Sequence, residues 1–85
     1  MERSNQRLAV AFGAALRQQR ELAGLTQEQL AERADVSARF VSFLETGKRQ
    51  PSLSAIEVLS YALGVRMTFL VDVAESFYQV EHHDC

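Results

Sequence analysis

The sequence predicts an all-α fold in which five helices form a single domain over residues 1–85. Apolar residues recur with the three- and four-residue spacing of amphipathic helices along nearly the whole chain. Glycine, serine and threonine interrupt this pattern at points that suit helix ends. The 85 residues are 47% hydrophobic and 24% charged, a composition typical of a small folded domain and too apolar for a disordered chain.

The first helix is expected from about Leu8 to Gly24. Leu8, Phe12 and Leu16 fall on one helical face, and Gly24 suits the left-handed residue that closes a helix. Gly13 lowers helix stability by up to about 1 kcal/mol relative to alanine. Its presence inside the helix is favourable only where another element packs so closely that no side chain fits.

Two short helices are expected next, joined by a tight turn. Thr26 and Gln29 form a capping box that starts a helix ending at Ala34. Ser37 is a good N-cap for a third helix running to about Thr46. Two helices with this short connection are typical of a helix-turn-helix.

The fourth helix is expected to start at Ser52, or at Ser54 with Glu57 three residues on, and to end at Gly64. A fifth helical segment is expected over residues 68–80. A short strand is the alternative there, because apolar residues also alternate at Met67, Phe69, Val71 and Val73.

The fifth segment has more apolar surface than one small core needs. One helical stripe consists of Leu70, Val71, Ala74 and Tyr78, and a second of Phe69, Val73, Phe77 and Val80. A symmetric dimer buries the same patch on both chains, so residues 68–80 are expected to form a homodimer. The residues expected in this interface are Phe69, Val73, Phe77, Tyr78 and Val80. The alternative is that both stripes wrap the enlarged core of one chain.

The third helix has one apolar side and one small polar side. The side expected to face the core consists of Phe40, Val41 and Leu44. The opposite side consists of Arg39, Ser42 and Thr46, with Ala38 at its edge. A narrow polar side with a single cation fits the major groove of double-stranded DNA.

Base reading by this side follows from the chemistry of its residues. Arg39 can offer two donors to guanine O6 and N7, Ala38 suits a thymine methyl group, and Ser42 can bond several base edges. Contacts with the DNA backbone are expected from the start of the helix at Gln27 and from other residues near the two helices. The residues expected to contact phosphates are Gln27, Ser37, Thr46, Lys48 and Arg49.

Three segments of the chain resemble the Cro/CI-type (XRE) helix-turn-helix family. They are Thr26-Gln27-x-x-Leu30-Ala31-x-x-Ala34, Val36-Ser37-x-x-x-Val41-x-x-Leu44-Glu45-x-Gly47-x-x-x-Pro51-Ser52-Leu53 and Ala62-Leu63-Gly64-Val65. The resemblance extends over residues 8–71 and is far more specific than a bare helix-turn-helix.

The resemblance implies a five-helix, lambda-repressor-like domain whose third helix reads the major groove. It implies that Gln27 contacts phosphate and that the Lys48-Arg49 loop grips the DNA backbone. It also implies that Arg20 pairs with Glu45. The positions implied to approach bases are Ala38, Arg39, Ser42 and Phe43.

Two residues depart from the family pattern. Asp35 stands where the family usually has a glycine in a left-handed turn, a conformation that aspartate tolerates better than most residues. Phe43 stands at a position that is often a polar reader. It is expected either to pack at the edge of the domain or to touch thymine methyl groups.

The charge balance does not by itself indicate nucleic acid, because nine basic residues oppose eleven acidic ones. Their distribution is uneven, however. Residues 1–50 contain eight basic and six acidic side chains, whereas residues 51–85 contain one and five. The acidic second half is therefore expected to stay away from DNA.

The chain is expected in the cytoplasm. Its single cysteine, Cys85, excludes an internal disulfide framework and a cysteine-based zinc cage. No apolar run approaches the roughly 20 residues that span a bilayer. His82, His83, Asp84 and Cys85 are potential metal ligands, but adjacent residues rarely converge on one ion, so residues 81–85 are interpreted as a frayed tail.

These features predict a sequence-specific transcriptional regulator, a homodimeric repressor whose third helices lie about 34–36 Å apart on a pseudo-palindromic operator. A restriction–modification controller is one alternative. An antitoxin that binds a toxin protein through the C-terminal apolar surface is another, and a metal or redox sensor using the tail is a third. No enzyme activity, cofactor or effector pocket is expected in so few residues.

Overall fold

Five helices surround one apolar core in the computed structural model, which describes the backbone of residues 2–82 and the side chains of residues 6–79. In chain order they are α1 (Glu2–Leu22), α2 (Gln27–Ala34), α3 (Ala38–Glu45), α4 (Leu53–Leu63) and α5 (Met67–His82). No strand occurs over residues 2–82, so the all-α fold is confirmed and the strand alternative for the fifth segment is wrong.

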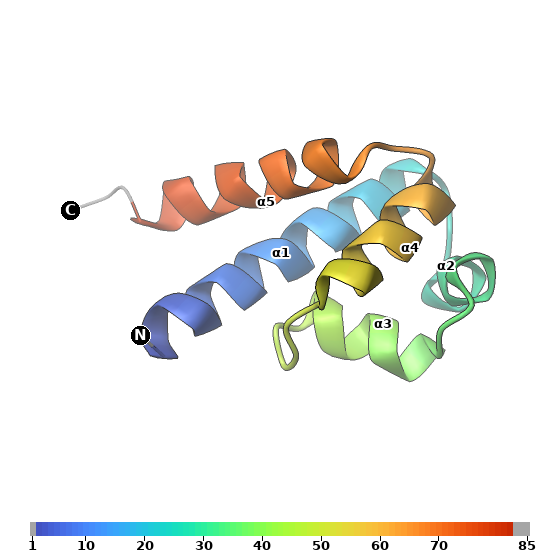
Figure 1. Ribbon diagram of the computed structural model, residues 1–85, viewed down its shortest axis with the longest axis horizontal. Helices are drawn as coiled ribbons and strands as arrows, with labels where there is room; N and C mark the ends of the chain where they lie inside the picture. The colour runs from blue at the N-terminus through green and yellow to red at the C-terminus, as the bar shows by residue number, and fades with distance from the viewer. Residues whose placement is uncertain (1, 83–85) are drawn as a thin grey trace.

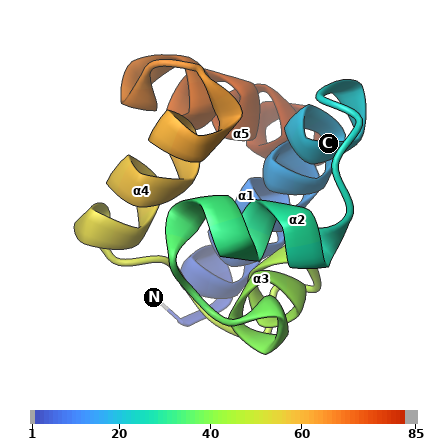
Figure 2. The ribbon, with the colours of Figure 1, turned by 90° about the vertical axis from the view of Figure 1, so that its right-hand side faces the viewer.

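The two long helices define the long axis of the molecule. α1 and α5 lie side by side and run in opposite directions along a molecule of 39 × 20 × 20 Å (Figure 1). The three shorter helices gather toward one end, where α2 and α3 form the helix-turn-helix and α4 lies between them and α5 (Figure 2). The helix-turn-helix therefore lies well away from the far half of α5.

The short helices begin where local sequence signals predict. The amide of Gln29 donates to Thr26 Oγ1 at 3.1 Å, and the Thr26 amide donates to Gln29 Oε1 at 2.9 Å, which completes the capping box. Ser37 Oγ accepts from the Phe40 amide at 3.0 Å. Ser52, rather than Ser54, caps α4 by accepting from the Ala55 amide at 3.0 Å. Side-chain capping thus fixes the start of each of these helices.

Asp35 closes α2 in the left-handed conformation, with φ of 60°. Its amide donates to Ala31 O and Glu32 O, two carbonyls of the last helical turn. A left-handed conformation is expected for Asp35, because the family that the sequence resembles usually has glycine at this position. Aspartate is one of the few residues with a side chain that visit this region.

The core lies between α1, α4 and α5 and is closed at one end by α2 and α3. Its largest fully buried side chains are Leu16, Leu30, Val41, Leu44, Leu59 and Leu70. Phe12 and Leu16 face this core as predicted, but Leu8 remains 48% exposed, so the predicted stripe fails at its first position. Leu8 lines an open hollow between α1, α4 and α5 instead of a closed part of the core, and α1 begins at Glu2, six residues earlier than expected.

Gly13 lies where α1 crosses the end of α3. A Cβ atom placed on Gly13 would collide with the carbonyl oxygen of Leu44 and would lie 2.8 Å from that of Glu45. Both neighbours are backbone atoms, which cannot move aside as a flexible side chain does. The missing side chain therefore allows α1 and α3 to touch.

The side of α5 that faces the core contains residues from both predicted stripes. Leu70 and Ala74 are buried, and Val73 and Phe77 are half-buried against the core cluster. Residues from both stripes therefore contact the chain's own core, which favours the alternative that both wrap the core of one chain, and the dimer interface stays a prediction. Apolar surface remains on the two flanks of the helix, where Phe69 is 45% and Val71 46% exposed.

Over the described residues, no helix taken alone combines the length and apolar character needed to cross a bilayer. By length and composition only, α4 and α5 meet that test together as a pair bent by 104°.

Candidate nucleic-acid interface

α3 is anchored to the domain by one side and leaves the other open. Val41 and Leu44 are fully buried, and Phe40 is half-buried at the edge of the core cluster. On the other side Arg39 is exposed and Ser42 is half-exposed. The helical wheel thus predicts correctly which side of α3 faces the core.

Phe43 lies on the outer side of α3. It is half-exposed and is absent from the hydrophobic residues that pack against the core cluster. The guanidinium carbon of Arg39 lies over its ring, 5.5 Å from the centroid. Phe43 is therefore available at the surface, one helical turn from the arginine expected to read bases.

A second arginine lies over a second aromatic ring nearby. The guanidinium carbon of Arg49 is 5.7 Å from the centroid of Phe40. Arg39, Phe40, Phe43 and Arg49 line one shallow hollow of the surface together with Val36 and Ser37. Sequence reasoning missed the Arg49–Phe40 pair, because a helical wheel does not place the loop after α3 beside that helix. It also missed the Arg39–Phe43 pair, although the two residues are four positions apart on the same helix.

Two of the candidate phosphate-binding residues, Ser37 and Arg49, line this hollow, and the others lie on α2 and in the segment that follows α3. Ser37 is exposed, and its hydroxyl oxygen accepts the Phe40 amide, so its own proton can still be donated. Lys48 and Arg49 are exposed on the loop after α3. Thr46 is also exposed, but its hydroxyl donates to the Ser42 carbonyl at 2.9 Å. Thr46 must therefore rotate its hydroxyl before it can donate to a phosphate.

Gly47 fixes the start of that basic loop. Its φ of +75° lies in the left-handed region, and an added Cβ would lie 2.8 Å from Val10 Cγ2 on α1. The chain therefore turns tightly against α1 before Lys48 and Arg49, which restricts where these cations can lie.

A buried ion pair connects α1 to α3. Arg20 Nε donates to Glu45 Oε2 at 2.6 Å and Arg20 Nη2 to Glu45 Oε1 at 3.0 Å, as the resemblance implied. The two side chains are only 12% and 3% exposed. Arg20 Nη1 also donates to the Leu25 carbonyl at 2.8 Å. One guanidinium thus joins the end of α1, the loop before α2 and the end of α3.

Gln27 is a third member of this network. Its side-chain amide donates to Glu45 Oε1 at 3.0 Å, which orients the first residue of α2 relative to α3. An amide nitrogen has two hydrogens, so one hydrogen bond to Glu45 leaves a second for another acceptor. Sequence reasoning placed Gln27 near phosphate but missed this contact, because nothing local relates positions 18 residues apart.

The hydrogen bond to Glu45 is the main reason that the pKa of Arg20 is raised above its ordinary value, while burial acts in the opposite direction. The guanidinium therefore remains charged at neutral and moderately alkaline pH. The charge of Arg20 is a permanent part of the network.

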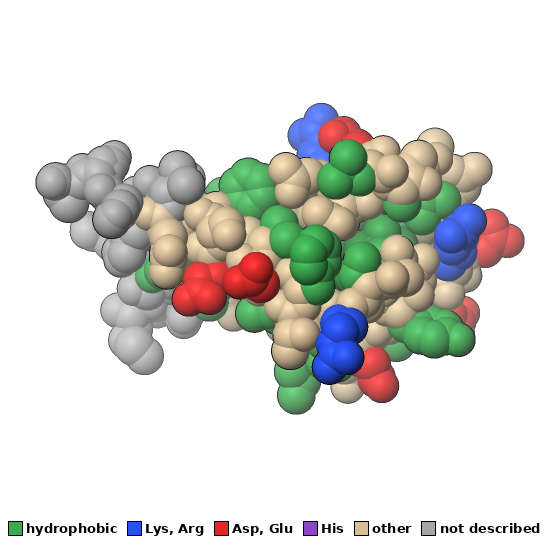
Figure 3. All heavy atoms as spheres, turned by 90° about the horizontal axis from the view of Figure 1, so that it is seen from above, with side chains coloured by type: hydrophobic (Ala, Val, Ile, Leu, Met, Phe, Trp, Pro, Cys, Tyr) green, Lys and Arg blue, Asp and Glu red, His purple; other side chains and the backbone are tan. Residues whose placement is uncertain are grey.

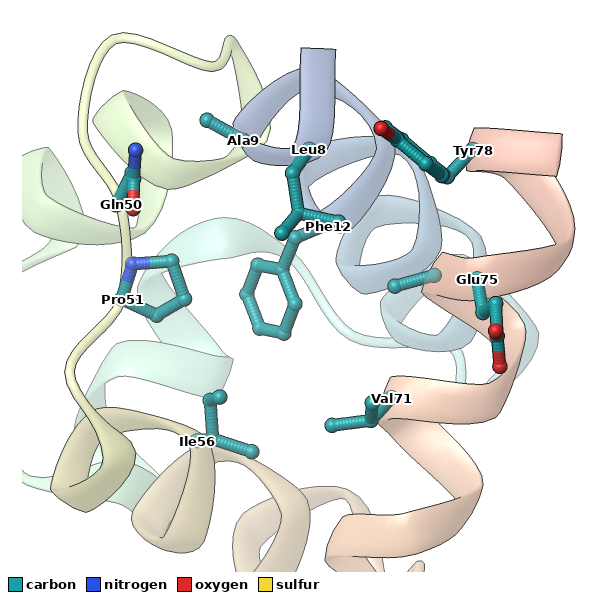
Figure 4. Close-up of a pocket in the computed structure, with 10 residues that line it drawn as sticks. Leu8, Ala9, Phe12, Gln50, Pro51, Ile56, Val71, Glu75 and Tyr78 are labelled. Carbon is teal, nitrogen blue, oxygen red and sulfur yellow. The ribbon is translucent and has the colours of Figure 1, made fainter. Parts of the chain in front are cut away.

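The structure has an apolar hollow that the sequence did not predict. A cavity of about 440 Å³ opens between α1, α4, α5 and Pro51. Phe12, Ile56 and Val71 point into it from the three helices, and Tyr78 lies at its edge (Figure 4).

The residues expected in a dimer interface do not form one exposed stripe. Phe69 is exposed, Val73 and Phe77 lie partly against the core, and Tyr78 lines the apolar hollow. On the face where α5 lies, apolar side chains occur between scattered charges (Figure 3). The side chain of Val80 and those of the predicted tail, residues 81–85, fall outside the described residues.

A family model described as helix-turn-helix matches residues 16–70, from the second half of α1 to the start of α5. This match includes both helices of the motif and the Arg20–Glu45 pair. The chain belongs to the XRE family of helix-turn-helix DNA-binding regulators.

This XRE-family chain is similar to two curated proteins of stated role. It is 39% identical over 57 residues to the immunity repressor protein of Bacillus phage phi105, a match covering 67% of this chain and 38% of that protein. It is 38% identical over 66 residues to the control protein C.BamHI of Bacillus amyloliquefaciens, covering 76% of this chain and 82% of that protein. The chain thus spans less than half of the repressor but most of the control protein.

A solved structure shares the arrangement of the XRE-family helices. The clp gene regulator ClgR of Corynebacterium glutamicum superposes with a TM-score of 0.84 at 32% identity, covering 88% of this chain and 80% of that one. The fold predicted from the sequence is therefore confirmed by comparison as well as by the helices themselves.

Proposed function

We propose that this chain is a homodimeric repressor that binds a pseudo-palindromic DNA operator through α3. The observation that supports this function best is the asymmetry of α3. Its inner side is fixed by Val41, Leu44 and the Arg20–Glu45 pair, whereas its outer side is open and flanked by cations. A rigid helix with one open side fits the geometry of major-groove reading.

Each candidate residue has a defined role in the proposal, although Ala38 is half-buried against the core cluster. The base-reading residues are Ala38, Arg39, Ser42 and Phe43. Gln27, Ser37, Lys48 and Arg49 contact phosphates, which set the position of α3 but not its sequence preference. Thr46 joins them after its hydroxyl leaves the Ser42 carbonyl.

The homodimer is proposed to form through α5. Phe69 and Val71 leave apolar surface exposed on opposite flanks of that helix, and Val71 also lines the apolar hollow. A two-fold axis through this surface pairs identical patches. It also directs the acidic second half of the chain away from the operator. Such a dimer acts where the operator lies, so we place it in the cytoplasm.

The experiment that tests this function is selection of bound sequences from random duplex DNA, repeated at two salt concentrations. We expect two related half-sites whose centres lie about 10 base pairs apart, in inverted orientation. Binding should weaken steeply as salt rises, because the phosphate contacts release counterions. Recovery of no enriched sequence, with equal binding to all duplexes, would refute the proposal.

A restriction–modification controller is the second candidate. It is favoured by the similarity to the control protein C.BamHI, of which this chain covers 82%. The two candidates bind DNA with the same side of α3 and differ in the genes regulated. A reporter fused to the promoter that lies beside the selected operator distinguishes a repressor, which lowers expression, from a controller that also activates.

A further inference from the structure

Arg39 and Phe43 form a pair on the outer side of α3. They are one helical turn apart, and the guanidinium carbon lies 5.5 Å from the ring centroid, within the range of a cation–π contact. Phe43 is half-exposed and does not pack against the core cluster. A half-exposed phenylalanine on the outer side of α3 is thus not accounted for by packing against the core cluster.

The contact restricts the arginine before DNA is bound. A guanidinium that lies over a ring keeps its in-plane N–H groups free to donate, and its rotamers are already limited. The pair therefore presents two different surfaces together, an apolar ring edge and a planar fork of donors.

Two adjacent bases in the major groove match these surfaces. Guanine presents O6 and N7 as paired acceptors for arginine, and thymine presents a C5 methyl group that favours apolar contact. Successive bases of one strand are separated by about 3.4 Å, so a ring and a guanidinium in contact can reach neighbouring bases. Cytosine lacks the methyl group, whereas 5-methylcytosine has it at the same position as thymine.

We propose that Arg39 and Phe43 read one dinucleotide as a unit, namely a C5-methylated pyrimidine followed by guanine on the same strand. Thymine–guanine is the natural form of this step, and 5-methylcytosine–guanine fits by the same chemistry. This inference rests on the proposed operator binding by α3. It adds that the affinity of the protein responds to a single methyl group on the DNA.

The test uses the selected operator as synthetic duplexes that differ by one methyl group. Replacing the thymine by uracil removes the C5 methyl and keeps base pairing. Burial of one such group predicts about a fourfold loss of affinity. In a second series the thymine–adenine pair becomes cytosine–guanine, and methylating that cytosine at C5 should raise affinity by the same factor.

Protein variants show whether Phe43 causes the effect. In Phe43→Ala the ratio of thymine to uracil affinity should fall to about one. Phe43→Leu is the matched control, because leucine retains apolar contact with the methyl group but loses the ring that faces Arg39. It should keep most of the thymine preference and lose part of the discrimination at guanine. Thermal unfolding of both variants checks that α3 is intact.

Each failure has a distinct meaning. Equal binding of thymine and uracil duplexes by the unmodified protein overturns the inference and leaves the proposed function standing. The inference is also overturned if Phe43→Ala keeps the ratio of thymine to uracil affinity that the unmodified protein shows. A selected half-site without a thymine–guanine or cytosine–guanine step overturns it too. If selection enriches no sequence, the proposed function itself fails and the inference fails with it.

Discussion

Glu45 is the residue on which the position of α3 depends most. Its carboxylate is almost fully buried and accepts from Arg20 on α1 and Gln27 on α2. A buried carboxylate that loses its cation is much less stable than one exposed to water, because no solvent replaces the lost partner. The three residues therefore act together as a joint between the three helices that position the DNA-facing side.

Removing Arg20 should destabilise the fold strongly. We expect Arg20→Ala to lower the free energy of unfolding by about 3 kcal/mol, measured by urea denaturation. Arg17→Ala is the matched control, because Arg17 pairs with Glu21 on the exposed side of α1, where the side chains are 65% and 56% exposed. Arg17→Ala should lower the free energy of unfolding by less than about 0.5 kcal/mol. Equal losses in the two variants would show that burial of Glu45 has no energetic importance.

Arg39 and Lys48 should affect DNA binding in different ways. Arg39→Ala should relax the preference at one base pair of the half-site by about 1–3 kcal/mol of discrimination. Lys48→Ala should weaken binding to all duplexes to a similar extent. It should also reduce the slope of log affinity against log salt concentration by about one, the effect of losing one phosphate contact. Competition binding against single-position operator variants measures both. An unchanged preference in Arg39→Ala would remove this residue from the readers.

At the residue scale, the sequence predicted those features that have a local or family signal. Arg20 and Glu45 were implied by the resemblance, and the tolerance of Asp35 for a left-handed turn follows from its side chain. The Gln27–Glu45 bond and the two arginine–aromatic contacts were missed. The Gln27–Glu45 bond and the Arg49–Phe40 contact depend on how separate elements meet, which neither periodicity nor capping encodes. The Arg39–Phe43 contact is local, and its four-residue spacing was a signal that could have found it.

At the scale of elements, the contact between α1 and α3 depends on Gly13. A glycine inside a 21-residue helix is unfavourable by propensity alone. Here the backbone carbonyls of Leu44 and Glu45 occupy the space in which a side chain would lie. α1 is therefore intrinsically less stable at Gly13 but packs closely against α3 there.

Gly13→Ala should consequently destabilise the protein although it improves helix propensity by about 1 kcal/mol. Overpacking against rigid backbone typically lowers stability by about 1–3 kcal/mol, so we expect a net loss measured by urea denaturation. We also expect weaker operator binding, because α3 must move away from α1. An increase in stability would mean that the two helices are not in contact in solution.

Helix positions could be predicted well where polar caps mark them. Thr26, Ser37 and Ser52 each accept a backbone amide at the start of a helix, and these interactions are local. The start of α1 and the face that α5 turns inward could not be predicted. Both depend on where α1 and α5 lie against each other, and α5 is apolar over so wide an arc that several rotations satisfy its periodicity.

At the scale of the whole molecule, the remaining apolar surface predicts self-association. Introducing a charge at Phe69 should oppose the proposed dimer, because an unpaired charge would be buried in it. We expect Phe69→Glu to shift the chain toward monomer in sedimentation equilibrium and to weaken operator binding, because the second half-site no longer adds avidity.

The matched control for that variant is Leu22→Glu, which places the same charge at a side chain that is 75% exposed near the end of α1. It should leave the association state unchanged. If the unmodified chain is already monomeric at micromolar concentration, the homodimer is wrong and an antitoxin that pairs with another protein becomes the better interpretation. Thermal unfolding of both variants confirms that they remain folded.

The most direct test of the account is to titrate the selected operator duplex into the ¹⁵N-labelled chain and follow its backbone amides by NMR. The outer side of α3 is predicted to enter the major groove, so the largest shifts should occur over residues 37–43, at Gln27 and at Lys48 and Arg49. Shifts confined to α5 and the apolar hollow, with α3 unperturbed, would contradict the account.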